Sequence, residues 1–261
     1  MGDSKRWRCA FCKKSDSPPS TEDVLAKWII KEYDAKRSLI KRTDQITGKV
    51  TWPRGNAGLL TQAPCRRCNT TWMSQLENKA MPLITKFMGG WDAEITSSEK
   101  LLLSKWMLKT SIMYEYAKGE DRYFSATERW NLFSLGLLPQ FTSISAARFV
   151  SDSRKVSSKS TGMRIDIRKK NGRFEGKGGK FESDLYSINV TIEQLALQLF
   201  TTRKPPEISS SEITVKMKFI NWDEFTVPIH PPYANSKWPP THHLNDEQLV
   251  QFIDRWTDLG V

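Results

Sequence analysis

Hydrophobic residues follow a helical spacing through much of the first half of the chain. From Asn69 they recur every three or four positions, as one face of a helix requires, and a pair of glycines ends the pattern. The same spacing predicts helices over residues 97–118, with Ser98 as the cap, and over residues 126–135.

Closer to the N-terminus the elements are shorter. Thr21 is the expected cap of a helix over residues 22–33, which carries an apolar face. Residues 36–53 predict a basic loop or hairpin that turns at residues 47–49, and residues 57–63 predict a short strand.

After residue 139 the spacing changes to the alternation of half-buried strands. Three of these strands are expected, over residues 144–150, 163–168 and 213–220. Residues 186–200 also alternate, but the phase slips at Glu193-Gln194, where a bulge, a hairpin turn and a short helix all remain open. An irregular proline-rich segment over residues 228–240 precedes a closing amphipathic helix over residues 245–258.

These patterns predict an α+β protein. Its first region, residues 1–139, is rich in helices, and its second, residues 140–261, is rich in strands and ends in a helix. The pattern leaves open whether the two regions are separate domains or share one core.

Charge narrows the choice of partner. The chain carries a formal net charge of +11 and has a pI near 9.5, which favours a polyanion. Nucleic acid is the commonest such partner, an anionic membrane surface is the second, and a basic protein without such a partner is the third reading. No apolar run is long enough to span a bilayer, and residues 1–9 lack the apolar segment of a signal peptide, so we expect a cytoplasmic protein with no membrane partner.

Four cysteines stand in two tight pairs, Cys9 with Cys12 and Cys65 with Cys68. Two thiolates spaced in this way can chelate one ion from a single turn, and two such turns complete a tetrahedron of sulfurs. In a reducing cytoplasm the doubled pair favours metal ligation over disulfides, over unliganded core cysteines and over a redox pair. We therefore expect one structural Zn²⁺ with no open position for chemistry.

Basic residues flank both cysteine pairs, and their charge favours thiolate over thiol. They are Arg8, Lys13, Lys14, Arg66 and Arg67.

Three stretches, C-A-F-C, S-T-E-D-V-L-A-K-W-I and C-R-R-C-N-T-T-W-M-S-Q-L-E, together resemble HNH-type (ββα-metal) endonucleases. The closest likeness is to bacterial and phage members with paired zinc knuckles. The resemblance covers about residues 7–90, and C-x2-C-N-x2-W is its most specific part. It implies an HNH-like ββα module and a metal-dependent DNA endonuclease of bacterial or phage origin.

The resemblance also implies which residues form the active site. Glu22 stands at the acidic position of the family, and Asp23 stands where the catalytic histidine belongs. Asn69 matches the middle asparagine, and Glu77 falls where the last histidine often binds the catalytic metal.

The chain departs from the family at the base. Its three histidines, His230, His242 and His243, are all far from the motif in sequence. An ordinary aspartate is a much weaker base than histidine at neutral pH. Asp23 serves if burial raises its pKa, or if it binds Mg²⁺ or Mn²⁺ together with Glu22 and Glu77.

An inert reading of these carboxylates stays open beside the catalytic one. Glu22 and Asp23 are favourable charges in the first turn of a helix. Glu77 pairs with a lysine such as Lys79 or Lys100, and Asn69 only caps its helix.

A second basic stretch lies in the β-rich region, and a phosphate backbone or plain solvent accounts for it equally well. Its expected nucleic-acid contacts are Arg168, Lys169, Lys170, Arg173 and Lys177. Arg66 and Arg67, beside the second cysteine pair, are the other expected contacts. His242 and His243 offer a less favoured second metal site or a base supplied from across the fold.

The sequence thus predicts a metal-dependent DNA endonuclease, either intact or weakened, acting on DNA rather than RNA. The alternative is a catalytically inactive HNH derivative that binds nucleic acid as a regulator, or that binds a protein as an inhibitor or adaptor. A protein partner would be contacted through the C-terminal region.

Overall fold

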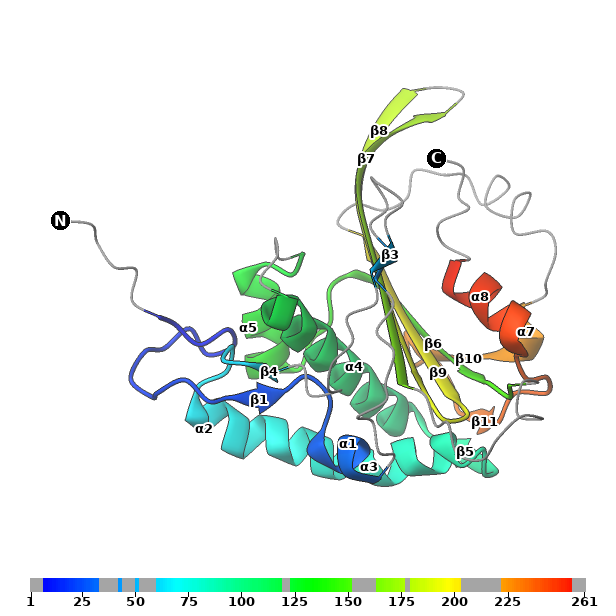
Figure 1. The fold of residues 1–261 in the computed structure, drawn as a ribbon, viewed down its shortest axis with the longest axis horizontal. Coiled ribbons are helices and arrows are strands. Elements are labelled where there is room, and N and C mark those ends of the chain that lie inside the picture. The colour runs from blue at the N-terminus through cyan, green and yellow to red at the C-terminus, as the bar shows by residue number, and fades with distance from the viewer. Residues whose placement is uncertain are drawn as a thin grey trace.

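The computed structural model describes residues 7–32, 42–43, 50–51, 60–118, 123–151, 163–176, 179–202 and 222–254. Helices and strands are mixed along this part of the chain, which confirms the α+β class. Figure 1 shows three layers, with helices α3, α4 and α5 on one side of a sheet and helices α7 and α8 on the other.

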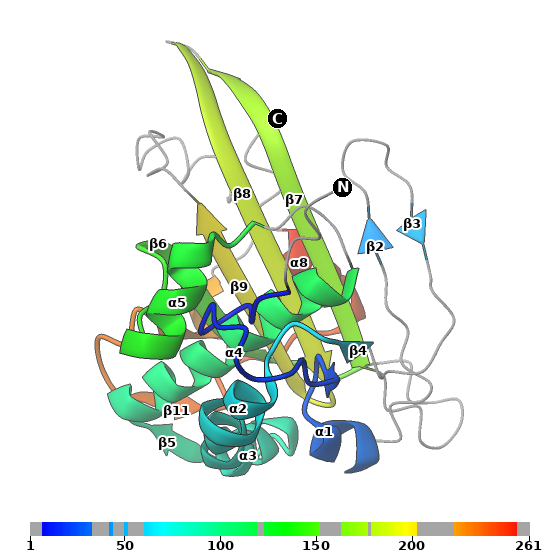
Figure 2. The ribbon, with the colours of Figure 1, turned by 90° about the vertical axis from the view of Figure 1, so that its left-hand side faces the viewer.

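The central sheet has five antiparallel strands in the order β10-β6-β9-β8-β7. Their bounds are Phe141–Arg148 (β6), Met163–Gly176 (β7), Gly179–Ile192 (β8), Leu195–Thr202 (β9) and Thr226–His230 (β10). Strands β7 and β8 run beyond the end of β9, so their outer half forms a two-stranded ribbon that projects from the sheet (Figure 2).

The first part of the chain forms a small two-stranded sheet followed by a long helix. Strand β1 (Glu22–Asp23) pairs antiparallel with β4 (Leu60–Thr61), although these strands are far apart in sequence. The helix then runs without a break through α2 (Arg66–Cys68), the π-helical turn η2 (Asn69–Met73) and α3 (Ser74–Met88). It ends at Gly89, as the glycine pair predicts.

The remaining elements complete the layers. Two further pairs of short strands are β2 (Arg42–Thr43) with β3 (Val50–Thr51), and β5 (Ala93–Ile95) with β11 (Ser236–Trp238). The remaining helices are α1 (Lys27–Glu32), α4 (Ser97–Lys118), α5 (Ala126–Leu135), α7 (Trp222–Phe225) and α8 (Asp246–Asp254).

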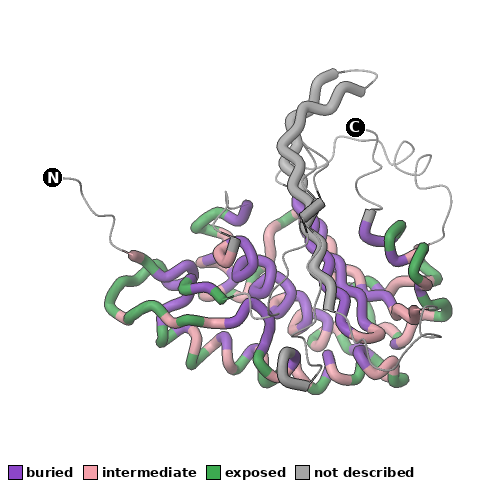
Figure 3. Tube along the Cα trace, in the orientation of Figure 1, coloured by how far each residue is buried: buried purple, intermediate pink, exposed green. Residues whose placement is uncertain are grey.

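One hydrophobic core joins the two regions that the sequence distinguishes. It includes Phe11 near the N-terminus, Trp106 of α4, Tyr186 of β8 and Trp238 of β11. Helix α4 is buried along most of its length and lies at the centre of this core (Figure 3). A smaller cluster around Phe252 packs α8 against the other face of the sheet. The regions therefore share a core, while the boundary at residue 139 remains a prediction.

Three expectations need correction. Residues 22–23 form strand β1 instead of a helix start, and α1 begins only at Lys27, because Glu22 and Asp23 pair with β4. Thr96, not Ser98, caps α4, since its hydroxyl accepts a hydrogen bond from the Glu99 N–H at 3.3 Å. The segment over residues 228–240 is not irregular throughout, because it contains the end of β10 and all of β11.

Other expectations are settled or fall outside the described residues. The slip at Glu193-Gln194 is the turn of the β8–β9 hairpin, where Glu193 has a φ of 51°. Residues 36–53 contain the antiparallel pair β2–β3, which supports the hairpin reading. The turn over 47–49 and the strand expected over 213–220 lie outside the described residues. No helix in the described part of the chain is long and apolar enough to cross a membrane.

Candidate functional sites

The two cysteine pairs are brought together by backbone pairing between two distant segments. The N–H of Ala10 donates to the carbonyl of Ala63 at 2.9 Å, and the N–H of Arg66 donates to the carbonyl of Pro18 at 2.8 Å. Cys65 lies where the chain enters the long helix, so Cys68 falls one turn further along the same helix. The fold of this segment therefore places both knuckles at one point.

The four sulfurs of Cys9, Cys12, Cys65 and Cys68 all lie within 4.8 Å of one another, and all four residues are buried. The Sγ atoms of Cys12 and Cys65 are 3.7 Å apart. Four sulfurs at tetrahedral positions about 2.3 Å from one zinc ion are about 3.8 Å apart. The arrangement therefore fits a single metal ion held by four sulfurs.

The pKa values of the cysteine thiols also favour a cation in this cluster. A hydrogen bond with Cys68 lowers the pKa of the Cys9 thiol to about 4, and the same contact raises the pKa of Cys68. Burial raises the pKa of Cys12. Buried thiolates in contact repel one another, so all four ionise together only when a cation lies among them.

Aromatic side chains anchor the first knuckle to the helices. The ring of Phe11 meets that of Trp72 edge-on at 5.0 Å between centroids, and Trp72 contacts Phe133 of α5 at 5.8 Å. The buried guanidinium of Arg129 donates to the carbonyl of Ala10 at 3.0 Å. The cysteine cluster is thus part of the protein core.

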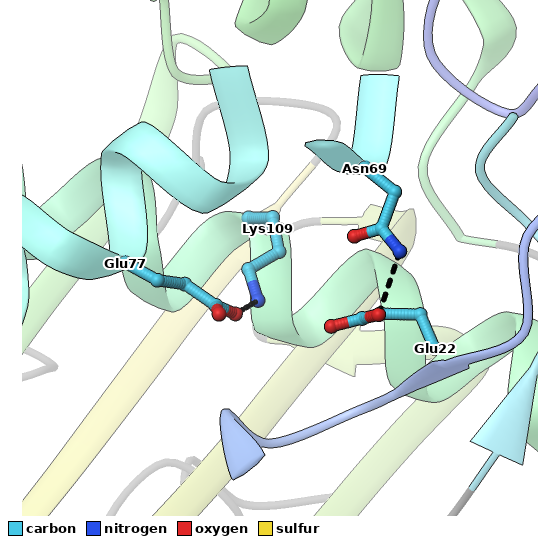
Figure 4. A network of polar contacts seen from close by, with 4 residues as sticks. All are labelled: Glu22, Asn69, Glu77 and Lys109. Atoms are coloured by element: carbon cyan, nitrogen blue, oxygen red, sulfur yellow. Dashed lines mark hydrogen bonds and ion pairs between the residues drawn. The ribbon is translucent and has the colours of Figure 1, made fainter. Parts of the chain in front are cut away.

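The acidic residues that the HNH resemblance singles out lie in a second cluster, beside the four cysteines. The amide Nδ2 of Asn69 donates to Oε2 of Glu22 at 2.7 Å and to the hydroxyl of Ser20 at 2.9 Å (Figure 4). Strand β1 supplies Glu22, and the turn η2 supplies Asn69. Asn69 therefore ties the strand to the helix instead of only capping the helix.

Glu77 lies two turns further along the same helix and binds a residue that the motif does not contain. Its Oε1 forms an ion pair with Nζ of Lys109 on α4, and the Lys109 side chain is fully buried. Figure 4 shows the Lys109 ammonium between the carboxylates of Glu77 and Glu22. Breaking a buried pair of this kind costs about 3–5 kcal/mol, because the remaining charge is left without a partner.

Helical spacing alone gives a partial signal for Lys109. Its position falls on the same face of α4 as Trp106 and Met113, which are both buried. A lysine at a core position requires a counter-charge. Glu77 does pair with a lysine, but the partner is Lys109 and not Lys79 or Lys100, so the expected partner is wrong. Lys100 instead donates to the hydroxyl of Ser236 at 2.6 Å.

Burial raises the proton affinity of the two acids on β1. Burial raises the pKa of Glu22, and the nearby charge of Glu77 adds to this, while the hydrogen bond from Asn69 and the charges of Lys109 and Lys27 oppose it. Burial also raises the pKa of Asp23, which is 9% exposed. Asp23 thus meets the first condition for a base in place of histidine.

The carboxylates do not meet the second condition, which is to hold a metal ion together. Within the described residues, the four cysteines are the one group of three or more His, Cys, Asp or Glu residues whose ligand atoms lie close enough together to hold a metal ion. Glu22, Asp23 and Glu77 thus do not converge on a common point as ligands of one ion. Three carboxylate ligands for Mg²⁺ or Mn²⁺ are therefore not present in this arrangement.

The expected nucleic-acid contacts fall in two places. Arg66 and Arg67 are exposed, beside the metal centre. Arg168, Lys169, Lys170 and Arg173 lie on strand β7. The first three are opposite β8 residues that still pair with β9, whereas Arg173 lies in the projecting ribbon. Lys177 lies outside the described residues. The two places are separate parts of the molecule, as Figure 2 shows.

The histidines belong to the C-terminal region. His230 lies in β10, where burial lowers its pKa. Nε2 of His242 lies 3.4 Å from a carboxylate oxygen of Glu224, and the His242 ring contacts Phe225. These contacts connect His242 to α7.

No family model, no curated protein and no solved structure matches this chain. The function is accordingly argued from the two sites themselves.

Proposed function

We propose that this chain is a nucleic-acid-binding protein built on an HNH-like zinc module. At the position of the cleavage site, Lys109 is already ion-paired with Glu77, so the module does not cleave nucleic acid. Two features support the HNH-like part of this proposal. Strands β1 and β4 form an antiparallel pair that is followed by a long helix, and one cysteine pair lies before β1 while the other lies after β4. Zinc is the metal whose preference for four thiolates matches the donor set. Its role is to hold the two knuckles together.

The observation that carries the proposal is a basic surface around the metal centre, which we call the basic rim. Its five residues are exposed, and each lies within two positions of a cysteine; they are Arg8, Lys13, Lys14, Arg66 and Arg67. Asp16 is the acidic residue between the first knuckle and β1. Even after the double negative charge of a Zn(Cys)4 centre, the rim remains positive.

The rim is positioned to hold a polyanion across the module. The backbone hydrogen bonds from Arg66 to Pro18 and from Ala10 to Ala63 hold the two segments that carry the rim next to each other. Lys13 lies with its Nζ 5.6 Å from the centroid of the Trp130 ring, which also restrains it. A phosphate backbone offers evenly spaced negative charges to such a surface.

Binding to a random-sequence DNA duplex over a range of salt concentrations tests the proposal. Arg66→Gln/Arg67→Gln should lower affinity about tenfold at low salt and reduce the salt slope by about two. Lys86→Gln/Lys237→Gln removes the same charge from exposed positions on α3 and β11 and is the matched control. Equal binding by the two double variants would contradict the role of the rim.

Strand β7 is the rival surface in the same experiment. Lys169→Gln/Lys170→Gln removes two charges from β7. If this variant, and not Arg66→Gln/Arg67→Gln, loses affinity and salt slope, the contact lies on β7 and the rim is only a solvated surface.

A weakened metal-dependent endonuclease is the second candidate. It is favoured by Asp23, because a buried carboxylate with a raised pKa is a better base near neutral pH than an ordinary one. Nicking of supercoiled plasmid in Mg²⁺ or Mn²⁺ separates the candidates. Our proposal predicts no nicking by the wild type, whereas nicking that is lost in Glu77→Ala would establish the endonuclease. Nicking gained only by Asp23→His would identify a decayed site.

A further inference from the structure

The carboxylate cluster already contains a cation of its own. Three acids gather there, Glu22 and Asp23 on β1 and Glu77 on α3. The basic groups that act on them are Lys109 on α4 and Lys27 at the start of α1. Lys27 is exposed, but the Lys109 side chain is fully buried and ion-paired to Glu77.

The position of Lys109 lets one charge serve two carboxylates. Its ammonium bonds directly to Glu77, and its charge also reaches Glu22, which Asn69 holds from the other side. Figure 4 shows the ammonium between the carboxylates of Glu77 and Glu22, and Asn69 bonded to Glu22. A buried lysine is tolerated only where it is paired, so the same contacts keep the ammonium in place.

A divalent ion that used Glu77 as a ligand would have to displace Lys109. The displaced ammonium would stay in the core without a partner, which costs the equivalent of about a hundredfold or more in affinity. Sites with few protein ligands for Mg²⁺ bind weakly, since the ion keeps several of its waters. A penalty of this size leaves such a weak site without bound Mg²⁺ at physiological concentrations of the ion.

We propose that Lys109 is the resident cation of this cluster, so that the site takes no divalent ion, and that removing its charge uncovers an Mg²⁺- or Mn²⁺-binding site. The ligands of the uncovered site would be Glu22 and Glu77, whose carboxylates lie on either side of the ammonium. This inference goes beyond the proposed function, since it concerns ion binding and needs no cleavage or nucleic acid.

Titration of the full-length, zinc-loaded protein with Mn²⁺, followed by electron paramagnetic resonance of the free ion, tests the inference. The wild type should bind no Mn²⁺ at this cluster up to millimolar concentration. Lys109→Met, which keeps the length of the side chain, should bind one Mn²⁺ at least tenfold more tightly than the wild type. Lys109→Met/Glu77→Gln should lose that site, because one ligand is gone.

Two results would overturn the inference. One is a submillimolar Mn²⁺ site in the wild type that disappears in Glu77→Gln or Glu22→Gln. The other is a folded Lys109→Met protein that binds Mn²⁺ no better than the wild type. If Lys109→Met does not fold, the titration of the wild type, Glu77→Gln and Glu22→Gln still tests whether the cluster takes a divalent ion. The DNA-binding experiment above tests the proposed function independently of this result.

Discussion

The cysteine centre and the carboxylate cluster hold negative groups in the same small module, but they deal with charge repulsion differently. The four sulfurs gather within 4.8 Å of one another, and all four cysteines are buried. The carboxylates of Glu22 and Glu77 instead lie on either side of the Lys109 ammonium. The first site is suited to an ion from outside, whereas the second contains a protein cation of its own. Acidic residues that lie close together therefore do not by themselves identify a metal site. A lysine or arginine among them can already neutralise their charge.

Removing a sulfur ligand should produce the largest effect. Cys65→Ser deletes one ligand of an ion whose binding contributes to folding, so we expect loss of zinc and a fall in melting temperature of more than about 10 °C. Zinc content by mass spectrometry and thermal unfolding by circular dichroism measure the two effects. A strong chelator should reproduce them in the wild type. Retained zinc with an unchanged melting temperature would show that the sulfurs do not form a metal centre.

Neutralising Lys109 should produce the next largest effect. Lys109→Met leaves Glu77 without its buried partner, and we expect a loss of about 3–5 kcal/mol in the free energy of unfolding. Urea denaturation measures it. Lys109→Met/Glu77→Gln should recover part of the loss, because the unpaired charge is gone. The control is Lys105→Met, a partly exposed position on the same helix, which should cost less than about 1 kcal/mol.

Asp23 should show the smallest effect, and it depends on pH. Burial raises the pKa of Asp23 in the folded protein, so its protonated form favours folding. That stabilisation is complete below the unfolded pKa and is lost as pH rises through the folded pKa. Asp23→Asn should therefore raise the melting temperature by about 1–3 °C at pH 8, and the gain should vanish near pH 4. A gain that grows toward low pH would contradict this assignment.

The sequence predicted the elements that depend on local pattern. Helix α4 has the bounds that its hydrophobic spacing indicates, and α5 ends before Gly136, whose φ of 65° suits a glycine. The cysteine cluster could also be predicted, because ligand spacing within each pair is a local property.

The sequence failed where a distant partner decides the structure. Glu22 and Asp23 read as the first turn of a helix, but they form a strand because Leu60 and Thr61 pair with them. The identity of the Glu77 partner could not be predicted either, since Lys109 lies on another helix. Spacing shows only that Lys109 falls on a buried face. These two non-local contacts determine where the carboxylates of the cluster lie and which cation neutralises them.

Native mass spectrometry of the wild type, loaded with zinc and then exposed to excess Mn²⁺, tests the contrast between the two sites most directly. We expect one zinc ion per chain and no bound manganese, because the sulfurs offer a site for an external cation and Lys109 already neutralises the carboxylates. A chain carrying one zinc and one manganese, with the manganese lost in Glu77→Gln, would contradict it.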